Sequence, residues 1–223
     1  MDSVSVDELV KEVRITLDEN QTESSYLESS TDNMELDEII RAKLIDAVRS
    51  IIETCPVDLL EAVTLPTDTE VLHTNTDGSG YVILPDDFLR LVRFKLTSWN
   101  RAVTYAESEG SEADEIQRNE FTRGTYIKPV CVFSHNSDGD RTMEYFTAGK
   151  GTGGSYDHTI ETALYVPYPA IDSTIGTDKI DIPHLLRPCI VYYCAGLTEL
   201  TRGNNNQADA FFKIATSFYN KEG

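Results

Sequence analysis

The sequence has no apolar stretch that approaches the roughly 18–20 residues of a membrane-spanning helix. It also lacks the features of a secretion signal, which begins with basic residues and continues into an apolar run. Here the first eight residues carry three acids and no base. We therefore expect a protein that is neither inserted into a membrane nor secreted.

Basic residues are scarce, with 19 Lys and Arg against 38 Asp and Glu, and the formal net charge is −19. Proteins that bind nucleic acid or an anionic membrane surface use Lys and Arg to neutralise phosphate groups. The charge therefore argues against both classes of partner. It favours protein partners with basic patches, or a surface to which DNA must not adhere.

Cysteines are few, and no two of them form a C-x-x-C motif. The four are Cys55, Cys131, Cys189 and Cys194. Because the chain is large and its cysteines are widely spaced, we expect reduced thiols in the core rather than a disulfide framework or a metal site. No metal or cofactor is expected.

Motifs for catalysis are also missing. Residues 136–140 (Asn-Ser-Asp-Gly-Asp) differ from a calcium loop because the glycine stands one place too early. Residues 149–154 lack the first glycine and the Ser or Thr that a phosphate loop requires. Ser155, Asp157 and His158 lie too close along the chain to form a catalytic relay easily. We therefore predict a hairpin turn, a loop and no enzyme.

The N-terminal segment is strongly acidic, with twelve acids and two bases in residues 1–38. Apolar residues at helical spacing between Val6 and Leu17 predict a helix. Residues 18–35 are polar or acidic and contain no base, which is typical of a mobile or extended connection. Residues 1–35 are therefore predicted to be an acidic helix followed by a flexible linker.

Helical periodicity returns at two places. An apolar stripe from Leu36 to Ile52 predicts a helix that Pro56 stops. Near the C-terminus, residues 183–202 and 206–221 form two further apolar stripes, with Gly203 placed to end the first helix and residues 204–206 to cap the second. These two helices are predicted to form an αα-hairpin.

Between the helical parts, residues 57–169 consist of short β-like runs separated by turn residues. The predicted strands are 71–73, 81–84, 91–99, 126–134, 142–147 and 159–168. We predict an α+β fold in which residues 36–56 and 170–223 form a small helical bundle. Residues 57–169 form an inserted, β-rich, sandwich-like region, enlarged at about 100–158.

This order of segments resembles the head–tail connector proteins of tailed bacteriophages, also called adaptor or ring proteins, which bind beneath the portal. The residues that carry the resemblance are Leu84-Pro85-Asp86-Asp87-Phe88-Leu89-Arg90-Leu91, a turn that enters a strand ending near Trp99. They are followed by residues 164–168 with Pro169, and by the C-terminal helix pair. The helix at 36–54 would complete the helical bundle of that family.

The resemblance implies a non-enzymatic virion protein of the tail or neck, made in the bacterial cytoplasm. Such a protein would form a closed, typically dodecameric ring that docks on the portal protein, extends the DNA channel and supports the next tail or ring protein. An acidic channel would let DNA pass without adhering. We expect residues 100–158 to form an outward β-domain, and the helix at 6–17 to dock on the portal in place of a C-terminal tail.

Two groups of residues are interaction candidates. The first is the shared turn, and the second is the aromatic set of the last helix, for packing or ring contacts. The candidates are Asp86, Asp87, Phe88, Arg90, Phe211, Phe212, Phe218 and Tyr219. For the two aspartates, capping of the turn is an equally good interpretation, and core packing is the default for the aromatic set. Two alternatives remain open: a β-rich carbohydrate- or protein-binding module of a virion that uses exposed Trp99 and Tyr residues, and a hydrolase whose site assembles in space.

Overall fold

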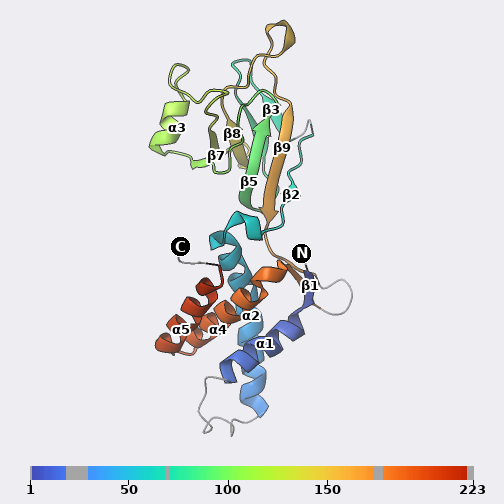
Figure 1. Ribbon diagram of the computed structural model, residues 1–223, viewed down its shortest axis with the longest axis vertical. Coiled ribbons are helices and arrows are strands. Elements are labelled where there is room, and N and C mark those ends of the chain that lie inside the picture. Colours follow the sequence, from blue (N-terminus) through green and yellow to red (C-terminus); the bar gives the residue numbers. More distant parts are fainter. Residues whose placement is uncertain (1, 19–29, 69–70, 173–177, 220–223) are drawn as a thin grey trace. The chain divides into compact units, whose positions relative to one another are not determined.

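The computed structural model describes residues 2–18, 30–68, 71–172 and 178–219 (Figure 1). It contains helices and sheets, with helices near both ends of the chain and strands between them, which confirms the predicted α+β class. The chain divides into two compact units. We call Met1–Glu61 with Tyr168–Gly223 the helical unit, and Ala62–Pro167 the β unit. No helix in the described ranges is long and apolar enough to cross a membrane.

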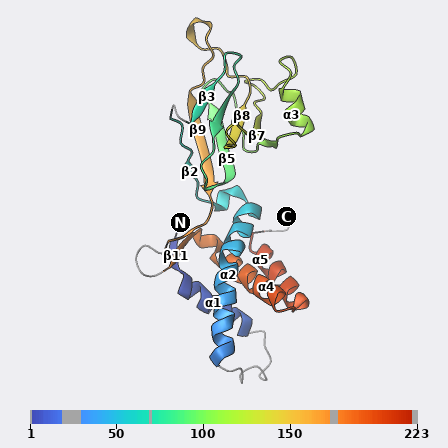
Figure 2. The same ribbon diagram turned by 180° about the vertical axis from the view of Figure 1, so that it is seen from behind.

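In its described residues, the helical unit combines four α-helices and two short 3-10 helices with a small antiparallel sheet (Figure 1, Figure 2). Its sheet has the strand order β1-β11-β10. The elements are β1 (Asp2–Ser5), α1 (Val6–Asp18), α2 (Ser30–Thr54), η2 (Val57–Leu59), β10 (Ile171–Asp172), β11 (Lys179–Ile182), η4 (His184–Leu186), α4 (Arg187–Thr201) and α5 (Asn205–Ser217).

Helix α2 begins earlier than its apolar stripe, which corrects the predicted boundary of the linker. Residues 30–35 were expected to belong to a flexible connection, but they form the first turns of this helix. Their sequence, Ser-Thr-Asp-Asn-Met-Glu, has residues that favour a helix start and acids that favour its N-terminal dipole. The rest of the predicted linker, residues 19–29, lies outside the described residues.

The apolar face of helix α1 is part of the core of the helical unit, and the expectation that this helix docks on the portal stays a prediction. Its apolar face is buried, and β1 pairs with β11 next to it. Arg187 of α4 donates hydrogen bonds to Glu8 and Glu12, with Nη2 at 2.5 Å from a carboxylate oxygen of each. These two carboxylates raise the pKa of Arg187 above its ordinary value. The apolar face of α1 is thus covered by this chain, and the residues it leaves exposed are Asp7, Glu8, Lys11 and Ile15.

Helices α4 and α5 form the predicted hairpin. Gly196 lies under the ring of Phe212, where a Cβ atom would come within 2.7 Å of the ring. This residue therefore lets α5 pack closely against α4. The N-cap of α5 is Asn204, within the predicted residues 204–206, but its side chain makes no capping hydrogen bond. Its amide donates instead to the buried carboxylate of Glu199.

The β unit contains two sheets, with strand orders β2-β9-β5 and β3-β4-β8-β7-β6. All pairings are antiparallel except that of β6 with β7. The elements are β2 (Val63–Thr64), β3 (Leu72–Thr74), β4 (Gly80–Ile83), β5 (Phe88–Leu96), β6 (Glu107–Ser108), α3 (Glu112–Gln117), β7 (Cys131–His135), β8 (Arg141–Tyr145), η3 (Thr152–Gly154) and β9 (Ile160–Pro167).

Both sheets contribute side chains to one apolar core, as a sandwich-like arrangement requires. Phe94 of β5, Tyr145 of β8 and Trp99 have their ring centroids within 5.6–6.3 Å of one another. Strands β7 and β8 come from residues 100–158, which were expected to form an outward β-domain. That expectation is corrected: β8 lies between β4 and β7, and its side chains fill the shared core.

Candidate interaction surfaces

The turn that carries the family resemblance is built into the β unit. Phe88 is only 2% exposed and stacks on Tyr165 of β9, with a centroid distance of 5.3 Å. The Tyr165 hydroxyl donates to Asp87 at 2.9 Å, and burial together with this carboxylate raises the pKa of Tyr165 to about 12. Asp86 is exposed and Arg90 is half-buried on β5.

This geometry corrects the assignment of Phe88 as an interaction residue. Its ring belongs to the core, and the Arg141 guanidinium lies 5.9 Å from its centroid. The turn therefore joins the start of β5 to the end of β9. Within the motif, Asp86 keeps an exposed side chain, as does Asp87 despite its bond to Tyr165.

The four aromatic candidates separate into core and surface, and α5 ends at Ser217, earlier than the predicted 221, so Phe218 and Tyr219 follow the helix. Phe211 is buried against Tyr192 of α4, and Phe212 is half-buried beside Tyr193. Phe218 also contacts Tyr192 but is 47% exposed. Tyr219 is half-buried, and its hydroxyl lies 3.1 Å from the hydroxyl of Thr54. Phe218 is therefore the member of the set best placed to meet another molecule.

The three residues considered for a catalytic relay each form hydrogen bonds with residues outside that set. The Ser155 hydroxyl donates to the Thr152 carbonyl, and Asp157 accepts from Thr97 and Thr159. His158 shares a 2.8 Å hydrogen bond with the buried Tyr145. The structure thus does not bring Ser155, Asp157 and His158 together through hydrogen bonds.

The two loop motifs also have structural explanations. Residues 136–140 form the β7–β8 hairpin turn, where the Asn136 side chain accepts from the backbone N–H groups of Asp138 and Asp140. Residues 149–154 belong to a loop that a backbone bridge between Lys150 and Tyr156 closes. The Gly149 N–H donates to the Ser98 hydroxyl. Both are turns of the β unit, as predicted.

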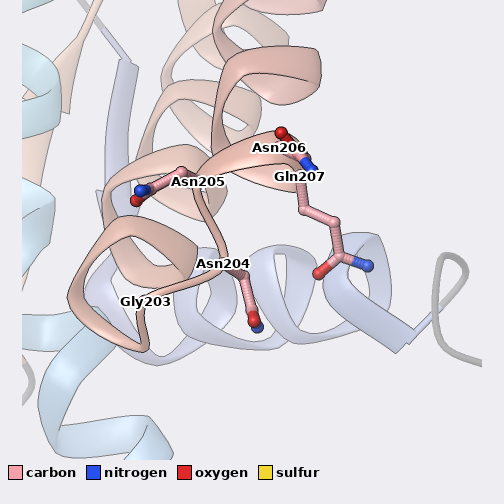
Figure 3. A pocket seen from close by; sticks show the side chains of 5 residues that line it. All are labelled: Gly203, Asn204, Asn205, Asn206 and Gln207. Carbon is pink, nitrogen blue, oxygen red and sulfur yellow. The ribbon is translucent and has the colours of Figure 1, made fainter.

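A hollow in the helical unit lies at the connection between α4 and α5 (Figure 3). It is lined by Gly203, Asn204, Asn205, Asn206 and Gln207, none of which is ionisable at neutral pH. These side chains can donate and accept hydrogen bonds, but they provide no acid, base or nucleophile for catalysis. The hollow therefore offers polar contacts rather than reactive chemistry.

Among the described residues, the large apolar side chain with the greatest exposure is Phe121, which the sequence analysis did not identify. Phe121 is 94% exposed, and Ile116, Tyr126 and Ile127 are also exposed within the same stretch. We call residues 110–128 the Phe121 loop. The sequence predicted a loop or a short helix over residues 106–120 and a strand from residue 126, and the single aromatic residue at 121 gave no signal of its own.

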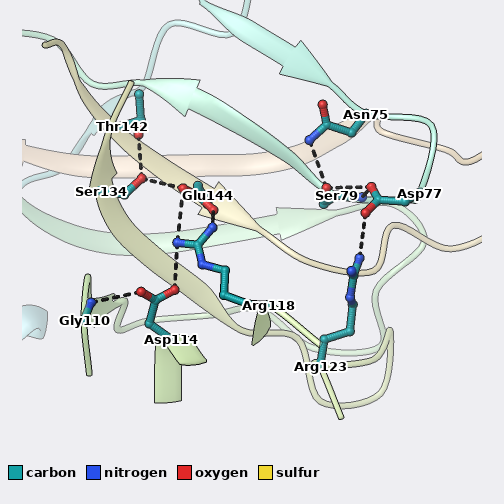
Figure 4. Close-up of polar contacts among 10 residues, drawn as sticks. All are labelled: Asn75, Asp77, Ser79, Gly110, Asp114, Arg118, Arg123, Ser134, Thr142 and Glu144. Atoms are coloured by element: carbon teal, nitrogen blue, oxygen red, sulfur yellow. Dashed lines mark hydrogen bonds and ion pairs between the residues drawn. The ribbon is translucent and has the colours of Figure 1, made fainter. Parts of the chain in front are cut away.

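The first half of the Phe121 loop is attached to β8 through Arg118 (Figure 4). Arg118 lies 2.6 Å from Glu144 of β8 and 2.7 Å from Asp114 of α3. The buried Asp114 also accepts from the Gly110 N–H, and Glu144 accepts from Ser134 of β7. A continuous polar network thus holds α3 against the sheet.

The second half of the loop is attached to the β3–β4 turn through Arg123 (Figure 4). The Arg123 guanidinium lies 3.0 Å from Asp77, which also accepts from the Ser79 hydroxyl at 2.6 Å. Ser79 and then Arg123 hold the pKa of Asp77 at about 2. In addition, the Gly124 N–H donates to the buried Gln117 side chain at 2.6 Å. The backbone on both sides of Phe121 is therefore held in place.

These polar groups predict how the stability of the β unit depends on pH. Burial lowers the pKa of His158 below its ordinary 6.5, so the unfolded chain takes up this proton first, and stability falls as the pH drops below 6.5. The low pKa of Asp77 contributes stability above about pH 4, and this contribution is lost towards pH 2. Both groups make the unit less stable in acid.

Urea unfolding at a series of pH values checks this prediction. His158→Gln should flatten the decrease between pH 6.5 and 5, whereas Asp77→Asn should flatten the decrease below pH 4. An unchanged slope between pH 6.5 and 5 in His158→Gln would contradict the assignment to this histidine.

Comparison of the sequence with protein-family models and with curated proteins finds no match.

Proposed function

We propose that this protein is a structural subunit of a bacteriophage virion, a head–tail connector that assembles as a closed, dodecameric ring. The ring docks on the portal protein, extends the DNA channel and presents a platform to the next tail or ring protein. The protein has no catalytic role in this proposal. It is made in the bacterial cytoplasm and incorporated into the tail or neck region of the virion.

The observation that supports this proposal best is the order of elements along one chain. Helix α2 is followed by the Leu84–Leu91 turn, the strand pair β5 and β9, and the hairpin of α4 and α5. This is the order on which the resemblance to connector proteins rests. Exposed apolar side chains in both units, such as Leu185 and Phe121, agree with a protein whose surfaces meet other proteins.

The charge of −19 is the second support. A subunit repeated around a ring multiplies its own field, and acids that face a channel repel the phosphates of passing DNA. DNA is then cargo rather than a bound partner. Contacts between neighbouring subunits in such a ring are heterologous, so each subunit uses two different surfaces.

A virion module that binds carbohydrate or protein is the alternative. The carbohydrate form was expected to use exposed Trp99 and Tyr residues. Trp99 is 2% exposed and its indole N–H donates to the Thr147 carbonyl, whereas Tyr105 and Tyr126 are exposed. The stacking platform expected for a sugar is therefore absent at Trp99. The exposed side chain of Phe121 supports the other form of this alternative, a module that binds protein.

Native mass spectrometry of the purified protein, alone and mixed with the portal protein of the same genome, tests the connector proposal. We expect a closed ring, either alone or only on the portal, and its mass gives the copy number. A stable monomer that ignores the portal would overturn the proposal, and glycan binding would then be measured. Because α1 belongs to the core, the full chain is required rather than a variant without residues 1–35.

A further inference from the structure

The Phe121 loop presents an aromatic side chain in an arrangement that is unusual for a monomer surface. Large apolar residues that stay exposed in a group mark sites of contact with other molecules. Phe121 and its three exposed apolar neighbours come from only twelve residues. The hydroxyl of Thr122 donates to the Ile116 carbonyl at 2.9 Å, so α3 and the Phe121 turn lie next to each other.

The backbone around Phe121 is ordered before any partner binds. The Phe121 N–H donates to the Asn119 side chain at 3.0 Å, and the Arg123 N–H donates to the Asn119 carbonyl at 3.0 Å. Arg118 and Arg123 attach the two sides of the turn to the β unit. A residue held in this way loses little conformational freedom on binding, which is what an interface anchor requires.

The charges that surround Phe121 indicate the chemistry of the partner. Glu112, Glu115 and Glu120 are exposed, and none has an ion-pair partner among the residues that the structure describes. The two arginines of the loop pair with acids of the β unit, although Arg118 remains exposed, and Lys128 is a further exposed cation of the loop. The exposed charges of the loop that lack an ion-pair partner are therefore mainly the three glutamates, and a surface complementary to them carries positive charge.

We propose that the Phe121 loop docks on a different protein, inserting the Phe121 ring into an apolar pocket bordered by lysine or arginine side chains. A second copy of this chain is the poorer occupant, because it carries the same exposed glutamates and the same charge of −19. The inference deepens the proposed function, on which it rests for the choice of partners: the portal protein and the next tail or ring protein.

Site-specific crosslinking tests the inference directly. The photoreactive residue p-benzoylphenylalanine replaces Phe121 in the full chain, and in a control it replaces Tyr105, which is exposed in the β unit outside the loop. Each protein is irradiated alone, with the purified portal, and with the next tail or ring protein. We expect a crosslink from position 121 to one of these components, at an apolar site near Lys or Arg, and not from position 105.

Binding measurements with the same components provide the second readout. Phe121→Ser should weaken the complex about tenfold or more, as expected for an anchor residue, whereas Tyr105→Ser should change it less than about twofold. Neutralising Glu112, Glu115 and Glu120 to glutamine should slow association by a few-fold at low salt and remove most of its salt dependence. Circular dichroism confirms that each variant is folded.

The outcomes separate this inference from the connector proposal. A ring or portal complex that forms without a crosslink at 121 and without an effect of Phe121→Ser overturns the docking role alone. A crosslink between two copies of this chain also overturns it. If no complex forms with any component, the connector proposal fails. Crosslinking in phage-producing cells then decides the inference: it stands only if the captured protein rebinds in purified form and Phe121→Ser abolishes that binding, and it is overturned otherwise.

Discussion

Replacing Phe211 by alanine is expected to lower the free energy of unfolding of the helical unit by about 3–5 kcal/mol. The ring is 3% exposed and packs against Tyr192 of α4, so truncation leaves a cavity between α4 and α5. The close approach at Gly196 limits how far the two helices can collapse into that space. Urea unfolding followed by circular dichroism measures the loss.

Phe218→Ala is the matched variant for this prediction. Phe218 contacts the same tyrosine, but it is about half exposed, so its removal should lower the free energy of unfolding by only about 1 kcal/mol or less. If the proposed ring forms, Phe218→Ala should instead weaken subunit assembly in native mass spectrometry. Equal losses of stability in the two variants would contradict the division into core and surface.

Replacing Gly80 by alanine is expected to lower the free energy of unfolding of the β unit by about 3 kcal/mol. This value is the upper limit of the loss of about 1–3 kcal/mol that an added methyl group usually causes in a well-packed core. A Cβ atom at this position would come within 2.5 Å of Cζ of Tyr145 and 2.6 Å of the His73 carbonyl oxygen. Neither neighbour can easily move. Tyr145 is fully buried, and the carbonyl belongs to strand β3, which pairs with β4.

Gly139→Ala is the control for the Gly80 prediction. Gly139 lies in the β7–β8 turn with φ of 91°, and an added Cβ meets nothing within 4 Å. Its replacement should therefore cost only backbone strain, about 1–2 kcal/mol. Denaturant unfolding of both variants separates the two effects. A loss at Gly80 no greater than at Gly139 would show that the core can expand around β4.

The helices were predictable because their signal is local. Apolar spacing placed α1, α2, α4 and α5 in the correct order, and proline and glycine marked ends close to those observed. The start of α2 was missed because residues 30–35 lack an apolar stripe and continue a helix that is stabilised further along. The packing of α1 was not predicted for a different reason: burial of its apolar face depends on α4, far away in the sequence.

The strands were located less accurately, and their pairing was not predictable beyond hairpins. The predicted strand at 126–134 begins only at Cys131, because the Thr125 N–H bonds to Lys128 in a local turn. Strands β5 and β9 pair across about seventy residues, and no local pattern specifies such a partner. The same pairing buries Phe88, a residue whose turn context suggested a surface position.

The candidate interaction site shows the same division. The acidic composition and the lack of catalytic motifs favoured a protein that binds other proteins. The aromatic residues near the C-terminus were identified from their helical spacing. Phe121 was not found, because its exposure depends on Arg118 and Arg123 reaching distant acids on β8 and on the β3–β4 turn. Only side chains brought together by the fold determine which aromatic residue is held outside the core.

By itself, the sequence determined the helices, the α+β class, the acidic charge and the absence of a membrane-spanning stretch, because each depends on composition or on spacing within one turn or strand. The tertiary structure decided the rest. It placed residues 100–158 inside the shared core, covered α1 with α4, and buried Phe88 and Trp99 while leaving Phe121 outside. These outcomes depend on contacts between residues that are far apart in the chain. A local sequence pattern does not predict which of these contacts form or how much they stabilise the fold.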